Sequence, residues 1–198
     1  SPLDWSLLPL ASSQLTIDAP VTMIGNGRNR AETPTTGYVG TVGKKQTWFG
    51  TTLVVGATEA QCYDWASGNA LRWGTNTVSG NAYVANSTEP GAWVTDCSYT
   101  TFDAQDDEAQ GAEGDSGGGV FSKDGSGAWS LVGIMAYIDT YAGQPGSTAV
   151  TGNKTYFADL SAYRRQILTT IPEPATVPVL LGLATLGFVV VRRLRRRR

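Results

Sequence analysis

The stretch with the clearest capacity for chemistry is a glycine-rich run at residues 113–119, which reads EGDSGGG. Glycines on both sides of Ser116 allow the backbone to turn sharply and to expose the serine hydroxyl. An exposed hydroxyl can attack a carbonyl carbon, and the N–H groups of Gly114 and Ser116 can then hold the developing oxyanion. The same composition also suits an ordinary turn with an incidental serine. The run therefore indicates either acyl transfer at Ser116 or a simple turn.

The longer string GDSGGGVF at residues 114–121 favours catalysis, because it resembles the nucleophile motif of the trypsin-like (chymotrypsin-fold) serine proteases. The resemblance implies that Ser116 is the nucleophile and that Gly114 and Ser116 form the oxyanion hole. Asp115 is expected to be structural, with a buried partner that neutralises it and shapes the hole. The implied activity is that of a serine endopeptidase that hydrolyses polypeptides through an acyl-enzyme. It requires no metal or organic cofactor, because backbone dipoles polarise the carbonyl.

Asp4 is the candidate for the aspartate of a catalytic triad. Alone, it reads as a turn residue before a strand, but residues 4–10, DWSLLPL, resemble the family's triad-aspartate segment. The chain contains no histidine, so it cannot supply the imidazole base of such a triad. The resemblance places that histidine about 45 residues before Asp4. We therefore expect a C-terminal portion of a protease that is inactive alone. The alternative is a protease-like surface or extracellular-matrix domain that binds without cleaving.

Three further positions are implied to contact the substrate. Gln110 lies six residues before Ser116 and resembles the base of the primary specificity pocket, where an Asp would have predicted cleavage after Lys or Arg. Residues 129–137 read as a strand similar to the family's substrate-pairing segment. In that segment Ala136 and Tyr137 replace the usual Ser and Trp.

The composition indicates the elements that position these residues. The 24 glycines and the Val/Thr-rich runs favour β-structure. The resemblance implies an all-β, two-barrel trypsin-like fold over residues 1–170, here incomplete, with the second barrel and the end of the first. Residues 28–70 are partly an insertion relative to the family. Strands are expected within residues 19–27, 47–49, 52–55, 71–78, 129–137 and 156–157, followed by a terminal helix over residues 160–168.

Cys62 and Cys97 are the only cysteines. An even number in an exported protein is typical of a disulfide, which we expect between these two residues. Two buried, unpaired thiols are the alternative.

An acidic loop precedes the nucleophile. Its acids are Asp103, Asp106, Asp107, Glu108 and Glu113. A solvated loop explains this pattern, and a calcium site is the alternative, although the spacing is not that of an EF-hand.

The last 28 residues, 171–198, form a separate module. The helix-breaking Pro-Glu-Pro at residues 172–174 precedes 17 uncharged residues, 175–191, and six arginines follow. This length is at the short limit of a membrane-spanning helix, and the arginines favour a cytoplasmic tail. A buried core helix fits poorly, because nothing after it could cover it. The module resembles the PEP-CTERM sorting signal of Gram-negative bacteria, which implies export, a single transmembrane helix as an inner-membrane anchor, and processing by an exosortase to the cell surface or medium.

The charge distribution argues against nucleic acid as a partner. The formal net charge of −2 is the sum of −8 over residues 1–191 and +6 from the terminal arginines. The part expected to fold is therefore acidic and offers no basic patch to phosphates.

Overall fold

The computed structural model describes residues 8–85, 92–105 and 107–170. This part of the chain contains eleven strands and one helix, so the expectation of an all-β protein is confirmed at this level. The chain divides into two compact units, residues 1–162 and 163–198, and every described strand belongs to the first. The elements are β1 Pro20–Gly25, β2 Arg28–Arg30, β3 Thr35–Val42, β4 Lys45–Trp48, β5 Thr58–Asn69, β6 Arg72–Ala85, β7 Val94–Thr101, β8 Gly119–Lys123, β9 Trp129–Asp139, β10 Thr148–Val150, β11 Lys154–Asp159 and α1 Leu160–Thr170.

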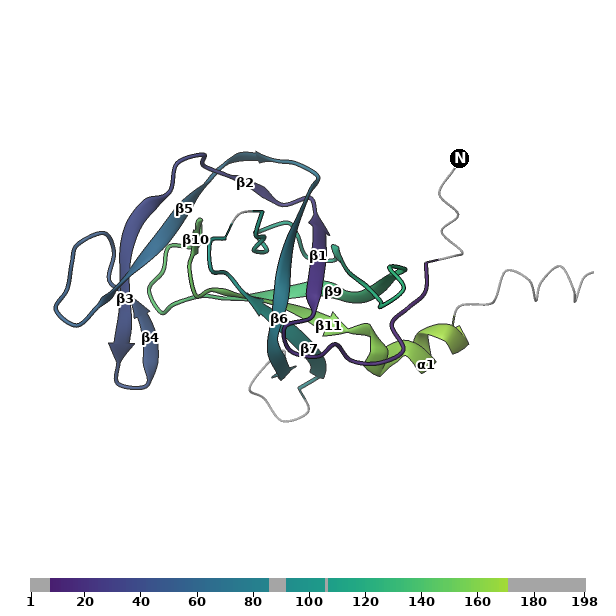
Figure 1. Ribbon diagram of the computed structural model, residues 1–198. Coiled ribbons are helices and arrows are strands. Elements are labelled where there is room, and N and C mark those ends of the chain that lie inside the picture. Colours follow the sequence, from purple (N-terminus) through teal and green to yellow (C-terminus); the bar gives the residue numbers. More distant parts are fainter. Residues whose placement is uncertain (1–7, 86–91, 106, 171–198) are drawn as a thin grey trace, which may run out of the picture. The chain divides into compact units, whose positions relative to one another are not determined.

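Six strands close into an antiparallel barrel in the order β1-β6-β7-β11-β9-β8 (Figure 1). The ring closes where β1 pairs with β8 through Thr22 and Phe121. Closure leaves these strands without a free sheet edge along their paired lengths, which removes sites for unwanted strand pairing.

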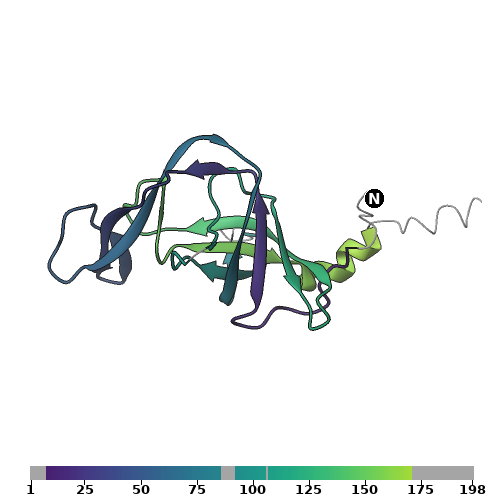
Figure 2. The same cartoon turned by 45° about the horizontal axis from the view of Figure 1, so that its top comes forward.

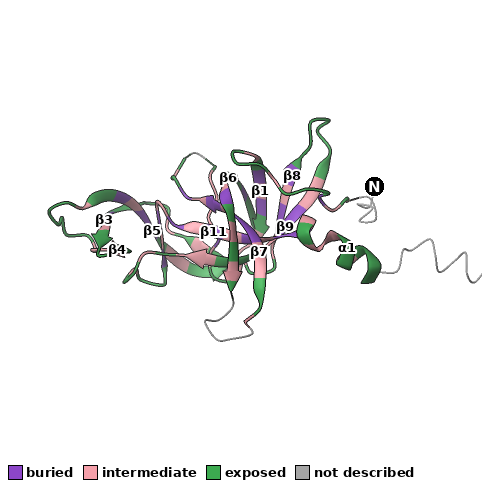
Figure 3. Ribbon diagram, turned by 90° about the horizontal axis from the view of Figure 1, so that it is seen from below, coloured by how far each residue is buried: buried purple, intermediate pink, exposed green. Residues whose placement is uncertain are grey.

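Alternation of side chains fills the barrel. In β1, Val21 and Met23 point inward and are 2% and 3% exposed, while Ile24 is on the outer face. Buried residues recur along the barrel strands, as the purple segments in Figure 3 show. The barrel core comprises Ala11, Val21, Met23, Val78, Val120, Val132, Met135 and Phe157.

A close contact between β9 and β11 depends on a glycine. The Phe157 ring is 1% exposed and lies directly over Gly133, where a Cβ would overlap the ring. The missing side chain lets the ring occupy the barrel interior, because close packing leaves no space for both groups.

A second sheet has the order β10-β5-β3-β4, with β2 paired to β5 (Figure 2). Val39, Ala60, Cys62 and Val150 form its core. Residues 28–70 therefore build most of a separate sheet, and β10 joins it from a position about 86 residues later in the chain, where Ala149 pairs with Tyr63.

The structure confirms the strands expected within residues 19–27, 71–78, 129–137 and 156–157, and β4 overlaps the expected strand at 47–49. The strand expected at residues 52–55 is wrong. This segment is a bend and turn between Gly50 and Gly56, which have φ of 84° and 82°. Leu53 and Val55 are 67% and 103% exposed, so β-type residues alone do not make a strand here without a neighbouring strand to pair with.

Helix α1 confirms the expected terminal helix. It begins directly after Asp159, whose Oδ1 accepts the Ser161 N–H (2.9 Å) and so caps the first turn. No helix in residues 8–85, 92–105 and 107–170 is long and apolar enough to cross a membrane. The expected membrane helix at 175–191 lies outside the described residues, as does Asp4.

Candidate functional site

The glycine-rich run forms a tight turn immediately before β8. Gly114 and Gly117 have φ of 95° and 85°, a region that residues with a side chain rarely adopt. Between them Ser116 is exposed, and no hydrogen bond to its hydroxyl is formed within the described part of the chain. The two glycines therefore present the serine hydroxyl to solvent, as the sequence predicts.

This turn is fixed to the barrel by β9. The Gly117 N–H donates to the Met135 carbonyl (2.9 Å), and the Met135 N–H donates to the Gly118 carbonyl (2.8 Å). These two bonds continue the β8–β9 pairing, whose last registered pair is Gly119 with Ile134. Ser116 is thus held one residue from the end of a hydrogen-bonded ladder.

Three N–H groups of residues 113–119 have no protein acceptor among the described residues. They belong to Glu113, Gly114 and Ser116, while the Asp115 N–H donates to the Ala112 carbonyl (3.1 Å). Backbone N–H groups without partners, clustered in a turn, suit the binding of an anion or a developing oxyanion.

The side chain of Asp115 points away from Ser116 and holds the turn in place. Its Oδ1 accepts the Gly27 N–H (2.6 Å) and its Oδ2 accepts the Ala112 N–H (2.8 Å). A Cβ on Gly25 or Gly27 would overlap this carboxylate. Asp115 was expected to be structural with a buried partner. In the structure its hydrogen-bond partners are two backbone N–H groups.

Gln110 lies beside a buried amide network. Its Nε2 is 3.4 Å from Oδ1 of Asn153, a residue that is 1% exposed and exchanges two hydrogen bonds with Gln144 (2.8 and 2.9 Å). The same Oδ1 accepts the Val150 N–H (2.9 Å), which fixes the orientation of the Asn153 amide. Gln110 Oε1 is buried and has no partner among the described residues.

Ala136 and Tyr137 lie on β9 just beyond the nucleophile turn. The β9–β11 register shifts here, because Tyr137 is opposite Tyr156 and Met135 is opposite Phe157, which leaves Ala136 as a bulge residue. Both residues are exposed. On the side of β8, no described strand pairs with residues 136–139, so this edge of β9 is open beside Ser116.

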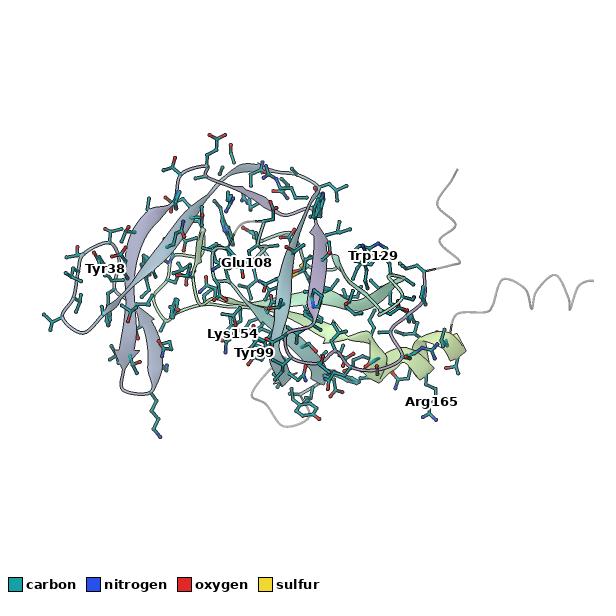
Figure 4. All side chains as sticks on the ribbon, in the orientation of Figure 1. Tyr38, Tyr99, Glu108, Trp129, Lys154 and Arg165 are labelled. Atoms are coloured by element: carbon teal, nitrogen blue, oxygen red, sulfur yellow. The ribbon has the colours of Figure 1, made fainter. Side chains whose placement is uncertain are left out.

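Tyr137 belongs to a row of aromatic rings on the outer face of the barrel. Its ring centroid is 5.4 Å from that of Tyr156, which is 5.1 Å from that of Tyr99. The Lys154 Nζ lies 4.8 Å from the Tyr99 centroid (Figure 4). Burial is the largest cause that raises the pKa of the Tyr137 and Tyr156 hydroxyls, with the Asp139 charge second.

Hydrogen bonds between the acidic loop's own residues stabilise it. Glu108, labelled in Figure 4, accepts the N–H groups of Asp103 (2.8 Å) and Gln105 (2.9 Å) through Oε2. Burial raises the pKa of the Glu108 carboxyl, against the opposing effect of these hydrogen bonds. The described residues contain no cluster of three or more acidic, cysteine or histidine side chains that could hold a metal ion. Asp106 lies outside the described residues.

The expected disulfide is absent from the structure, where Cys62 and Cys97 are free and buried. Cys62 lies on β5 in the second sheet and Cys97 lies on β7 in the barrel, opposite Ala82 and Ala158. An even cysteine count cannot reveal that the two residues belong to different sheets, and a bridge requires close Cβ atoms.

Sequence reasoning missed a cavity of about 290 Å³ between the barrel and the second sheet. Its lining includes Arg28, Arg30 and Arg72, the Asp115 side chain and several aromatic residues. Arg30 lies over the Tyr63 ring, with its Cζ 4.5 Å from the centroid. Because β2 and β5 meet only in the folded chain, no local pattern could have identified this cavity.

The fold and the site define an antiparallel β-barrel protein with an exposed serine in a glycine turn beside an open strand edge. Residues 170–198 match the PEP-CTERM protein-sorting motif, which confirms the sorting signal expected at residues 171–198. This motif indicates an exported protein that is anchored in the membrane and then passed to the cell surface, with an exosortase-type enzyme as its processing partner. No curated protein matches the chain.

Proposed function

We propose that this chain is the nucleophile-bearing part of an exported, trypsin-like serine endopeptidase. The observation that carries the proposal is the turn around Ser116. It combines an exposed hydroxyl, two N–H groups without protein acceptors at Gly114 and Ser116, and the open edge of β9. The six-stranded barrel is consistent with the second barrel of such a fold.

The open edge gives a polypeptide substrate a place to bind. An extended peptide can add to residues 136–139 of β9 as a further strand, with main-chain hydrogen bonds supplying affinity. This position brings one peptide carbonyl to Ser116. Tyr137 is exposed on the same segment and offers a ring to a neighbouring substrate side chain.

The chemistry follows the usual two steps of acyl transfer. The Ser116 Oγ forms a bond to the carbonyl carbon as its proton passes to a base, and the Gly114 and Ser116 N–H groups bind the oxyanion. The C–N bond then breaks and the base returns the proton to the leaving amine. Water hydrolyses the resulting ester by the same route, which releases a carboxylic acid and regenerates the serine.

The base must come from outside the 198 residues if it is a histidine, since the chain has none. We assign Asp4 to orient that histidine. The second candidate function is a protease-like domain that binds polypeptides at the β9 edge without cleaving them, which would need no histidine.

The test uses the complete gene product. We expect cleavage of peptides, and Ser116→Ala should lower kcat by about 10³- to 10⁶-fold with little change in KM. Ser13→Ala is the matched control, because Ser13 is exposed and distant in sequence from the turn. Unaltered turnover in Ser116→Ala contradicts the assignment of the nucleophile. Peptide binding without any cleavage identifies the binding domain instead.

A further inference from the structure

The cavity between the barrel and the second sheet has three arginines in its wall. Strands β2 and β5 lead from the second sheet into the barrel, where β1 precedes β2 and β6 follows β5 (Figure 1). Arg28 and Arg30 lie two residues apart on β2, and Arg72 begins β6 opposite Gly25 of β1. The pairing of two distant segments therefore brings three guanidinium groups to one cavity of about 290 Å³.

Arg30 and Arg72 have no carboxylate partner in the described part of the chain, where the only ion pair joins Arg28 to Glu113. The distance from Arg28 Nε to Glu113 Oε2 is 3.6 Å, and the two side chains are 43% and 70% exposed. An exposed ion pair of this kind contributes little free energy, so a bound anion can compete with Glu113 for Arg28. The positive charge of this wall is therefore open to an external anion.

Three acids also line the cavity, and among the described residues none of them pairs with its arginines. Asp115 accepts one backbone N–H on each carboxylate oxygen. Glu108 accepts two backbone N–H groups of its own loop through Oε2. Asp107 is exposed to solvent. These carboxylates therefore do not take the place of an anionic ligand at the arginines.

Much of the remaining wall is aromatic. The buried Tyr63 ring lies 6.1 Å from the Phe102 ring between centroids, and Arg30 covers it with its Cζ 4.5 Å from the Tyr63 centroid. This stacking orients the Arg30 guanidinium plane. Trp65 and Trp73 also line the cavity. Aromatic walls with a few charged groups are typical of sites that enclose an organic molecule and fix its orientation.

We propose that this cavity binds a small aromatic anion, whose carboxylate or phosphate group pairs with Arg28 and Arg30 and whose ring packs against the aromatic wall. Paired guanidinium N–H donors suit either oxyanion. The lining does not include Ser116, Ala136 or Tyr137, so the cavity is separate from the β9 edge where a peptide would bind. Most of the wall's arginine and aromatic residues lie in residues 28–70, which the family resemblance reads partly as an insertion.

The experiment measures the binding of phenyl phosphate to the full chain by isothermal titration calorimetry. Phenyl phosphate should bind about tenfold or more tightly than inorganic phosphate, because the ring adds buried apolar area. Arg30→Gln should weaken binding by about 10- to 100-fold, since hydrogen bonds to a charged group are lost. Arg165→Gln is the matched control, because it removes the same charge from an exposed position on α1 (Figure 4), and its affinity should be unchanged.

Benzoate in place of phenyl phosphate distinguishes a carboxylate ligand from a phosphate ligand. The inference is overturned if neither probe binds, if inorganic phosphate binds as tightly as phenyl phosphate, or if Arg30→Gln binds as well as the unmodified protein. Should Arg30→Gln not fold, Arg28→Gln gives the same test at an exposed side chain. Because only binding is measured, failure of the proposed peptidase activity would leave this result unaffected.

Discussion

Ser116 and Asp115 are neighbours in one turn, but their side chains point in opposite directions, one toward solvent and one toward the protein. Ser116 is exposed, while Asp115 is turned toward Gly25 and Gly27. The carboxylate receives one backbone N–H on each oxygen, which stabilises a charge that has lost part of its water. Asp115 thereby connects the end of β1 to the nucleophile turn.

Replacement of this carboxylate tests that connection. Asp115→Asn keeps the shape but places an NH₂ group against a backbone N–H donor, so one hydrogen bond to a charged acceptor is lost. We expect the free energy of unfolding to fall by about 1.5–3 kcal/mol, measured by urea unfolding. Asp64→Asn is the control, because Asp64 is exposed. Equal stability of Asp115→Asn and the unmodified protein would show that these bonds do not hold the turn.

Glu108 provides a pH-dependent prediction. Burial raises the pKa of its carboxyl in the folded state, so the folded protein binds this proton more tightly than the unfolded chain, whose pKa is about 4.3. The Glu108 contribution to stability is thus fully present below pH 4.3 and is lost as the pH rises through the folded pKa. In Glu108→Gln this fall in unfolding free energy should be absent as the pH rises above about 4.3, whereas the exposed Glu59→Gln should retain it. A fall of the same size in Glu108→Gln would refute the assignment.

At this scale the sequence predicts what depends on local backbone geometry. The exposed Ser116 follows from adjacent glycines, because their conformational freedom is a property of the residue itself. The partner of Asp115 could not be predicted, since Gly27 is 88 residues away in the sequence. The close packing of Gly111 against Thr155 and Ile138 could not be predicted either, because these two side chains come together only through the β9–β11 register.

Among the helices and strands too, those set by local sequence could be predicted and those set by distant strand pairing could not. Strand β1 and helix α1 could be predicted because their apolar residues recur with the period of the element. Strand β6 could be predicted from its alternation, although its buried residues include Gly74 and Asn76 while Trp73 is 71% exposed. The second sheet could not, because β5 pairs with β10 from a distant part of the chain. The exposed turn at residues 52–55 has the composition of a strand but no neighbour to pair with.

The cysteine-bearing strands yield a prediction that reverses the sequence-based one. Cys62 and Cys97 are 4% and 2% exposed, and burial is the largest cause that raises the pKa of both thiols. The neutral, inaccessible thiol reacts poorly. Both should therefore resist alkylation at pH 8 in the folded protein and react fully in denaturant without a reductant. Failure to react in denaturant, with a mass about two units lower, would instead demonstrate a disulfide.

The folded body and the C-terminal sorting motif have different roles. The barrel and second sheet use their apolar residues for a folded core within residues 8–162, whereas the sorting motif at residues 170–198 directs the chain to the membrane and then to the cell surface. The terminal arginines contribute +6 to the formal charge of an otherwise acidic chain. They are therefore best understood as part of the sorting signal and not of the site.

The final prediction concerns this signal. Entry of residues 175–191 into a bilayer is favourable, whereas each Arg near a helix centre costs about 2.5–3.5 kcal/mol. The span should stop at Val191, with the arginines in the cytoplasm, until processing near residues 172–174. In a host with an exosortase, the protein recovered at the surface should lack the arginine tail, and deletion of residues 175–198 should prevent anchoring.

A matched variant separates anchoring from processing. Replacing residues 172–174 by three alanines keeps both the apolar segment and the arginines, so this protein should remain in the membrane with its tail intact. Mass spectrometry of the C-terminal peptides from the membrane and surface fractions provides the measurement. An intact arginine tail on surface protein would contradict processing of the signal. Normal processing of the alanine variant would show that the processing enzyme does not need residues 172–174 to recognise the signal.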